Sequence, residues 1–267
     1  MTELRWRPTL LIRASLALHL LALLLVVIDP GQWRWALGAV LIDHLLLMLT
    51  GLWPRSNWLG PNWTRLPAAS AARREIALTI DDGPDPVVTP QVLDLLDRHA
   101  VRASFFCVGE KAARHPELCR EIARRGHTVE NHSQHHRHHF ALRGRAGLMR
   151  ELQAAQDTLT AITGRRPLFF RAPAGLRNPF LDPVLARLGL RLATWSARAY
   201  DTRTGDAGRV TNRLLRGLRP GAILLMHDGN AARTAGGTPV ILEALPAVLA
   251  AASAAGLRFV TLPQALA

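Results

Sequence analysis

Apolar and polar positions are arranged in two different ways along the 267 residues of the chain. Residues 9–28 and 36–53 are almost uninterrupted apolar stretches, close to the roughly 20 residues that cross a bilayer as a helix. From residue 75 onward, short apolar runs of strand length alternate with stretches of helical periodicity. The pattern therefore predicts a membrane-anchoring segment, 1–66, followed by a second domain, 67–267.

Several features favour a helical hairpin in the membrane. Tryptophans surround the two apolar stretches as in an interfacial belt, at Trp33, Trp35, Trp53, Trp58 and Trp63. No small-x-small cleavage site follows the first stretch, which favours an uncleaved anchor over a signal peptide. Asp43 and His44 lie inside the second stretch, which is costly in lipid unless they face another helix. Residues 54–73, rich in Pro, Gly, Asn and Ser, are expected to be a linker.

The orientation in the membrane depends on how many segments span it. Arginines precede the first apolar stretch and follow the second, so two spans place both ends of the hairpin on the cytoplasmic face of a bacterial inner or plasma membrane. A single span would instead place the second domain on the opposite side.

The second domain is predicted to be an α/β barrel of about seven parallel strands. The strand-length runs are 76–80, 103–108, 127–130, 168–170, 191–195, 222–226 and 258–262. Helical stretches separate them at 88–98, 110–125, 146–163, 180–188, 207–218 and 239–255. Alternation of strand and helix implies parallel strands joined by crossovers. In such barrels the active site forms at the carboxyl ends of the strands.

Composition and charge limit the classes of partner that the protein is expected to bind. The formal net charge of +13 suits an acidic partner, such as nucleic acid, anionic lipid or a phosphorylated substrate, although arginine bias of a GC-rich genome explains it equally well. A nucleic-acid partner is not expected, because no recognition motif is present and the chain has a single tyrosine. Cys107 and Cys119 lie in apolar or helical patterns and are expected to be buried thiols.

Polar side chains gather where the predicted strands end. Asp81 and Asp82 follow the first strand in "IALTIDDGPDP", and residues 132–139 contain five histidines. A spacing of four residues, one helical turn, occurs in two of the possible pairs, His132/His136 and His135/His139. Two histidines and a carboxylate with further positions open are typical of a catalytic metal site. The pattern therefore predicts one aspartate that binds a cation and one that transfers protons; the alternative is a solvated histidine-rich loop.

Five segments in order resemble the motifs of the polysaccharide deacetylases with a NodB homology domain, carbohydrate esterase family 4: "TIDDGP", "HSQHH", "RAPAG", "WSARAYD" and "LLMHD". The resemblance covers residues 75–266. It implies a distorted (β/α) barrel that hydrolyses N-acetyl, sometimes O-acetyl, groups of sugars. It also implies a divalent metal, with Zn²⁺ expected and Co²⁺ or another divalent ion as alternatives.

The resemblance assigns a role to each matching position. It implies that Asp81 is the general base and that Arg171 orients it. The three implied metal ligands are Asp82, His132 and His136. His227 is the implied general acid, and Asp201 tunes its pKa. The expected substrate-binding residues are Leu225, which would line the acetyl pocket, Ala174, whose backbone N–H would stabilise the oxyanion, and Trp195, which also fits a core position. Ala174 and Thr202 stand where the family often has an aromatic residue and a tryptophan, so the sugar-binding walls depart from the usual pattern.

Together these features predict a membrane-anchored, metal-dependent deacetylase acting on an envelope glycan or a lipid-linked saccharide. An O-acetyl carbohydrate esterase needs the same site and is one alternative. A non-catalytic membrane glycan-binding protein is the other, and the complete set of predicted base, acid and ligands argues against it. The expected partners are an acetylated sugar and membrane lipid, and no nucleic acid.

Overall fold

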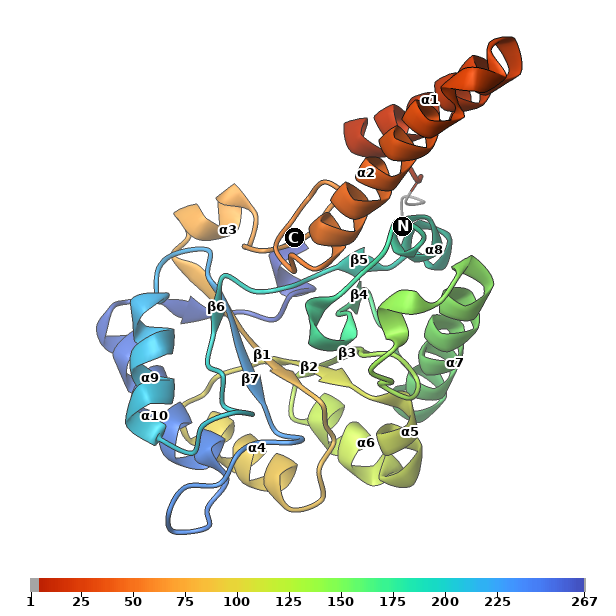
Figure 1. Cartoon of the computed structure of the whole chain (residues 1–267). Coiled ribbons are helices and arrows are strands. Elements are labelled where there is room, and N and C mark those ends of the chain that lie inside the picture. The colour runs from red at the N-terminus through yellow and green to blue at the C-terminus, as the bar shows by residue number, and fades with distance from the viewer. Residues whose placement is uncertain (1–4, 267) are drawn as a thin grey trace.

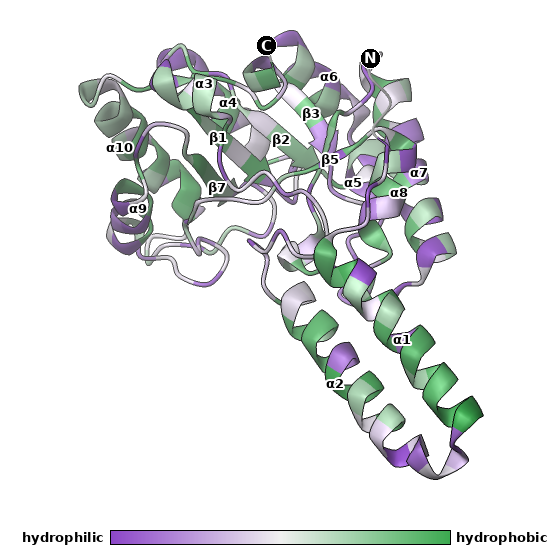
Figure 2. Cartoon of the chain, turned by 90° about the horizontal axis from the view of Figure 1, so that it is seen from above, coloured by the Kyte–Doolittle hydropathy of each residue, from purple (hydrophilic) through white to green (hydrophobic). Residues whose placement is uncertain are grey.

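The computed structural model describes residues 5–266, which form a helical hairpin attached to an α/β domain (Figure 1). Helices α1 (Leu10–Ile28) and α2 (Trp33–Gly51) project together from one side of the domain, connected through η1 (Pro30–Gln32). Their positions and lengths agree closely with the two apolar stretches. Figure 2 shows that hydrophobic residues dominate both helices along most of their length.

Polar side chains of the hairpin meet between its two helices. The Ser15 hydroxyl donates to Oδ2 of Asp43 at 2.6 Å, and Asp43 is buried. The rings of His19 and His44 lie edge to face with their centroids 5.2 Å apart. A carboxyl group inside an apolar stretch thus has partners on the facing helix, which is the condition under which it is tolerated in lipid.

Seven parallel strands form a curled sheet in the order β5-β4-β3-β2-β1-β7-β6. The strands are β1 (Glu75–Asp81), β2 (Ser104–Cys107), β3 (Thr128–Asn131), β4 (Phe169–Phe170), β5 (Arg191–Leu192), β6 (Ala197–Arg198) and β7 (Ile223–His227). A short β8 (Arg258–Phe259) pairs with the beginning of β1 outside this path. The predicted α/β barrel-like fold is confirmed.

Helices surround the sheet and follow the predicted stretches. They are α3 (Ala68–Ala72), α4 (Val88–Arg98), α5 (Gly109–Arg114), α6 (Pro116–Arg124), α7 (Arg145–Thr163), α8 (Leu181–Leu188), α9 (Ala207–Arg216) and α10 (Val240–Ala254), with short 3₁₀ turns η2 (Phe140–Leu142), η3 (Pro173–Gly175) and η4 (Gln264–Leu266). The expected helix at 110–125 is divided in two. Pro116 has no N–H to continue the first helix and begins the second, where a proline is favoured.

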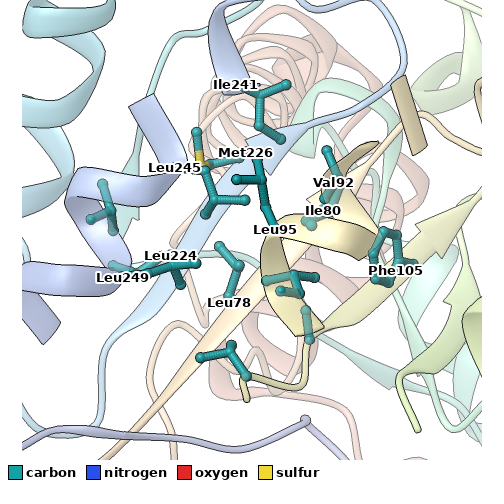
Figure 3. Close-up of a cluster of buried hydrophobic side chains, with 14 of the residues drawn as sticks. Leu78, Ile80, Val92, Leu95, Phe105, Leu224, Met226, Ile241, Leu245 and Leu249 are labelled. Atoms are coloured by element: carbon teal, nitrogen blue, oxygen red, sulfur yellow. The ribbon is translucent and has the colours of Figure 1, made fainter. Parts of the chain in front are cut away.

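The two central strands sort their side chains onto two faces. The outer face packs against α4 and α10 through Leu78, Ile80, Leu224 and Met226, all fully or almost fully buried (Figure 3). Because successive residues of a strand point to opposite faces, Thr79, Asp81 and His227 lie on the inner face. The apolar alternation of β1 and β7 therefore directs polar groups into the barrel.

The segment after the hairpin fills the opening between the two ends of the curled sheet. Trp63 pairs with Ala193, just after β5, and Arg65 pairs with Ala222, just before β7. Leu66 is buried in the barrel core together with Ala193. Residues 54–73, expected as a linker because of their turn-forming composition, are thus packed into the domain, and the base of the hairpin is held against the barrel.

Candidate active site

The ends of β1 and β3 bring one carboxylate and two imidazoles together. The Nε2 atoms of His132 and His136 each lie 3.2 Å from Oδ1 of Asp82, and the three ligand atoms lie within 4.8 Å of one another. Nδ1 of His132 donates to the backbone carbonyl of Arg171 at 2.8 Å, which orients the ring so that Nε2 points to Asp82. Two imidazole nitrogens and a carboxylate oxygen, with no fourth ligand grouped with them among residues 5–266, fit a catalytic divalent metal.

The histidine-rich segment after β3 is a loop, so the spacing of four residues does not correspond to a helical turn here. Ser133 and His136 have φ values of 66° and 51°, and this left-handed backbone turns the chain back toward Asp82. His135 bonds instead to Glu151, with Nδ1 3.2 Å from Oε2. His139 is exposed to solvent. Of the two pairs with the same spacing, only His132 and His136 approach Asp82.

Asp82 is held from several directions. Its φ of 73° is left-handed, and the only lysine of the chain, Lys111, donates from Nζ to its backbone carbonyl at 2.8 Å. Asn230 donates to Oδ2 at 3.2 Å. Burial raises the pKa of the Asp82 carboxyl, but hydrogen bonds from His132 and His136 outweigh it and hold this pKa well below its usual range. The carboxylate is therefore ionised and ready to bind a cation.

Two glycines allow the loops after β1 and β7 to touch. A side chain at Gly229 would overlap the backbone carbonyl of Asp82, and one at Gly83 would overlap the Asp228 carboxylate. Asp228 in turn accepts a hydrogen bond from Thr89 at 2.5 Å. The glycines of "DDG" and "HDG" are thus required for close approach of backbone.

Asp81 lies beside this cluster and is bound from inside the barrel. Nη1 of Arg171 donates to Oδ1 of Asp81 and to Oγ1 of Thr79, both at 2.7 Å. The other guanidinium nitrogens donate to backbone carbonyls that follow β5, and the side chain is fully buried. Arg171 therefore has one orientation. Oδ2 of Asp81, 3.8 Å from Nε2 of His132, faces the cluster.

His227 ends β7 in register with Asp81 at the end of β1. Nδ1 of His227 donates to Oδ1 of the fully buried Asp201 at 2.8 Å, and its backbone N–H donates to Oδ2 at 2.7 Å. Burial lowers the pKa of His227, but the hydrogen bond and charge of Asp201, with the charges of Asp81 and Asp82, raise it above its ordinary value. The protonated ring is thereby favoured, with Nε2 free to donate.

The expected substrate-binding residues occupy different environments. Ala174 is exposed in η3 with a φ of 55°. Leu225 is almost completely buried in β7, and Trp195 is buried with its ring 5.9 Å from the guanidinium carbon of Arg171. Thr202 is half-buried beside Asp201. Ala174 is thus the only one of the three at the solvent.

Known proteins share this arrangement of sequence and fold. A family model described as "Polysaccharide deacetylase" matches residues 68–193. The peptidoglycan-N-acetylglucosamine deacetylase of Bacillus cereus is 30% identical over 79% of this chain and 76% of its own length. The chain belongs to the polysaccharide deacetylase family. A chitooligosaccharide deacetylase of Azorhizobium caulinodans is 36% identical over 70% of this polysaccharide deacetylase and 92% of its own length.

Solved structures agree with the sequence comparisons. The Bc1960 peptidoglycan N-acetylglucosamine deacetylase is 30% identical, with a TM-score of 0.69 over 76% of this chain and 91% of that one. The family predicted from five short motifs, its fold and its enzyme class are confirmed. Members of this family hydrolyse N-acetyl amide bonds of sugars and depend on a divalent metal.

Two polar contacts of this polysaccharide deacetylase do not follow from the motifs. Lys111 and Asn230 both bind Asp82, yet neither belongs to a motif segment that predicts a role. The available signal for Lys111 is its rarity, because it is the only lysine among 33 basic residues. Asn230 lies three residues after His227 and has a left-handed φ of 62°, which only the folded loop reveals.

Proposed function

We propose that this chain is a membrane-anchored deacetylase that removes the N-acetyl group from a sugar of an envelope glycan or a lipid-linked saccharide. The observation that carries the proposal is the meeting of two imidazoles and one carboxylate at Asp82, with Asp81 and His227 in register beside them. The N-deacetylase activities named for the Bacillus cereus and Azorhizobium caulinodans relatives support the reaction type.

Asp81 is assigned as the general base that activates the attacking water. A divalent cation held by Asp82, His132 and His136, proposed to be zinc from the mixed N/O donors, would polarise the acetyl carbonyl and acidify the attacking water. Asp81 accepts the proton of that water through Oδ2, because Oδ1 is occupied by Arg171. The fixed guanidinium orients the carboxylate. We assign the backbone N–H of Ala174 to the developing oxyanion.

His227 is assigned as the general acid that protonates the departing amine. Its Nδ1–H is bound by Asp201, so the second proton of the charged ring is on Nε2. That proton passes to the sugar nitrogen as the C–N bond breaks, because an amine anion is too poor a leaving group to depart unprotonated. The products are acetate and the free amino sugar. Leu225 and Trp195 are proposed to shape the inner wall of the acetyl pocket.

The direct test is acetate release by the purified full-length chain in detergent, loaded with zinc. Short N-acetylglucosamine oligomers and an O-acetylated sugar are offered separately. Release from the N-acetylated oligomer supports the proposal. Release from the O-acetylated sugar alone would make the chain an esterase, and release from neither would leave a glycan-binding protein.

Membrane anchoring by residues 1–66 is the second part of the proposal, with the deacetylase domain in 67–267. Two helices of 19 residues match the thickness of a bilayer, and their leucines are exposed. The flanking arginines favour the cytoplasmic face for the domain.

We expect the chain to remain in the membrane fraction after an alkaline carbonate wash. Replacing both Leu20 and Leu21 by Arg should move it out of that fraction, because each charge near the centre of a spanning helix costs about 2.5–3.5 kcal/mol. Leu142→Arg, at an exposed leucine of the domain, is the matched control and should stay membrane-bound. Extraction of the unaltered chain by carbonate would contradict the anchor, and loss of the N-terminal residues in its intact mass would indicate a signal peptide.

The dependence of kcat on pH tests the acid. His227 must be protonated to act, so activity falls as the pH rises through its folded pKa. Because Asp201 is the largest of the influences that raise this pKa, Asp201→Asn should move the alkaline limb to lower pH. Asp206→Asn removes an exposed charge at the start of α9 and should leave the limb in place. An unmoved limb in a folded Asp201→Asn chain would remove Asp201 from its assigned role.

A further inference from the structure

A basic cavity of about 470 Å³ lies at the base of the hairpin, between the segment after α2, strand β6 and helix α9. Five arginines line it: Arg55, Arg198, Arg213, Arg216 and Arg219. Within the described chain, residues 5–266, no acidic side chain belongs to its lining. Arginines that converge without a carboxylate produce a positive potential that favours an anionic ligand. None of them belongs to the proposed catalytic machinery.

Aromatic rings hold two of these guanidinium groups in place. The guanidinium carbon of Arg198 lies 5.2 Å from the ring centroid of Trp195 and 5.0 Å from that of Tyr200. That of Arg213 lies 5.2 Å from Tyr200. Stacking orients a guanidinium group without using its N–H donors. Indeed, Nε of Arg198 is buried and has no hydrogen-bond partner in the part of the chain that the structure describes.

The guanidinium groups that line the cavity match a phosphate group in hydrogen bonding and charge. A guanidinium fork can donate two parallel hydrogen bonds to phosphate oxygens, and charge-assisted bonds of this kind are stronger than neutral ones. The volume of the cavity exceeds what a single phosphate fills and leaves room for a second phosphate or a sugar ring. The chemistry of the cavity therefore points to a phosphate ester.

The position of the cavity relative to the hairpin identifies the source of that phosphate. Helix α2 ends at Gly51, and Trp53 and Arg55 of the cavity follow within one turn. Trp53 is 57% exposed, as expected for a tryptophan at the membrane interface. With the hairpin inserted, the cavity lies at the level of lipid headgroups, where the phosphates of membrane lipids are found.

The cavity also adjoins the candidate active site. Trp195 lines it, and the guanidinium carbon of Arg171, the partner of Asp81, lies 5.9 Å from the centroid of its ring. Tyr200 is the neighbour of Asp201 in the sequence. At the same wall, Pro54 packs so closely on Gly175 that a side chain there would overlap it. The indole ring of Trp195 thus connects the wall of the cavity to the arginine that orients Asp81.

We infer that this cavity binds the phosphate of a lipid-linked sugar and so selects a membrane-lipid glycoside as the substrate. The inference rests on the proposed N-deacetylase function and adds the substrate class. It predicts that the arginines of α9 bind the phosphodiester that joins the sugar to the substrate lipid, and that this glycoside binds more tightly than a bulk bilayer lipid, whose headgroup carries no sugar ring.

Binding without turnover gives the first test, using the full chain in detergent micelles. The probe is a polyprenyl phosphate that carries glucose, which has no N-acetyl group to hydrolyse, with the neutral polyprenol and phosphatidylglycerol as the other two arms. We expect this glycoside to bind most tightly, and the double variant Arg213→Gln/Arg216→Gln to raise its Kd roughly 10- to 100-fold through lost charge-assisted hydrogen bonds. Arg209→Gln is the matched control, because Arg209 is on the same helix, pairs with Asp206 and does not line the cavity.

Two results of this binding test would overturn the inference. An unchanged Kd in the double variant would show that the cavity does not hold the phosphate. Equal binding of phosphatidylglycerol would make the cavity a general headgroup site without selectivity for the substrate.

Turnover provides the second test and separates the inference from the proposed function. The ratio of kcat/KM for N-acetylglucosamine on a polyprenyl phosphate to that for a soluble chitin oligomer is measured in each chain. The double variant should lower this ratio at least about tenfold, in line with the loss of binding, and Arg209→Gln should preserve it. An unaltered chain that prefers the soluble oligomer refutes the inference and leaves the deacetylase assignment standing. An unaltered chain that binds the lipid phosphate and deacetylates neither substrate would refute the deacetylase assignment, and only the phosphate-binding role of the cavity would stand.

Discussion

Removal of divalent metal from the purified chain is expected to abolish acetate release from N-acetylated sugars, and added zinc or cobalt should restore it. The ligand atoms of Asp82, His132 and His136 lie within 4.8 Å of one another, and without a cation they offer no electrophile to the acetyl carbonyl. Acetate release is measured after dialysis against a chelator, and far-ultraviolet circular dichroism verifies that the chain is still folded. Full activity in a rigorously metal-free preparation would refute the metal-dependent mechanism.

The histidine loop supplies a matched pair of variants for the same prediction. His132→Ala removes a buried nitrogen that approaches Asp82, whereas His139→Ala removes an exposed ring from the same loop. We expect His132→Ala to lose both bound zinc and activity and His139→Ala to keep about one equivalent of zinc. Loss of zinc from His139→Ala with retention in His132→Ala would show that the other pair of equal spacing binds the metal.

The strands and helices that pack the core follow directly from the hydrophobic pattern. Strand β1 and helices α4 and α7 lie within a residue of their predicted limits, because buried apolar residues at period 2 or 3.6 determine them. Strand β6 is different. Its two residues, in "WSARAYD", form no apolar run, and only pairing with β7 makes them a strand. The packing of Trp63 and Leu66 into the barrel is likewise decided by the gap in the sheet, which no local pattern displays.

The candidate site is predictable to the extent that its residues follow strands. Asp81 and His227 end adjacent parallel strands, and this alone brings them together. The choice of histidines depends on the family resemblance, because the loop that brings His136 to Asp82 contains left-handed residues that the spacing does not reveal. The basic cavity has no sequence signature at all, since Arg55 and Arg213 are brought together only by the folded chain.

Asp81→Asn is expected to lower the rate of acetate release by about 10²–10⁴-fold while bound zinc stays near one equivalent. The amide cannot accept the proton of water, but its oxygen can still accept the hydrogen bond from Arg171. Metal retention is expected because Oδ2 of Asp81 is 3.8 Å from Nε2 of His132, farther than the 3.2 Å that separates this nitrogen from Asp82. Zinc loss in the variant would make Asp81 a ligand, and a retained rate would exclude it as the base.

The same substitution also tests how Asp81 and Arg171 depend on each other. Arg171 is fully buried, and removing the charged partner of a buried ion pair typically lowers the free energy of unfolding by about 3–5 kcal/mol. Because Asn preserves an acceptor for the 2.7 Å hydrogen bond, we expect a smaller loss than for Asp81→Ala. Denaturant unfolding of both variants measures that difference, and rates are then compared per folded molecule. A rate defect that disappears after this correction would mean that Asp81 supports the fold and that proton transfer belongs to another group.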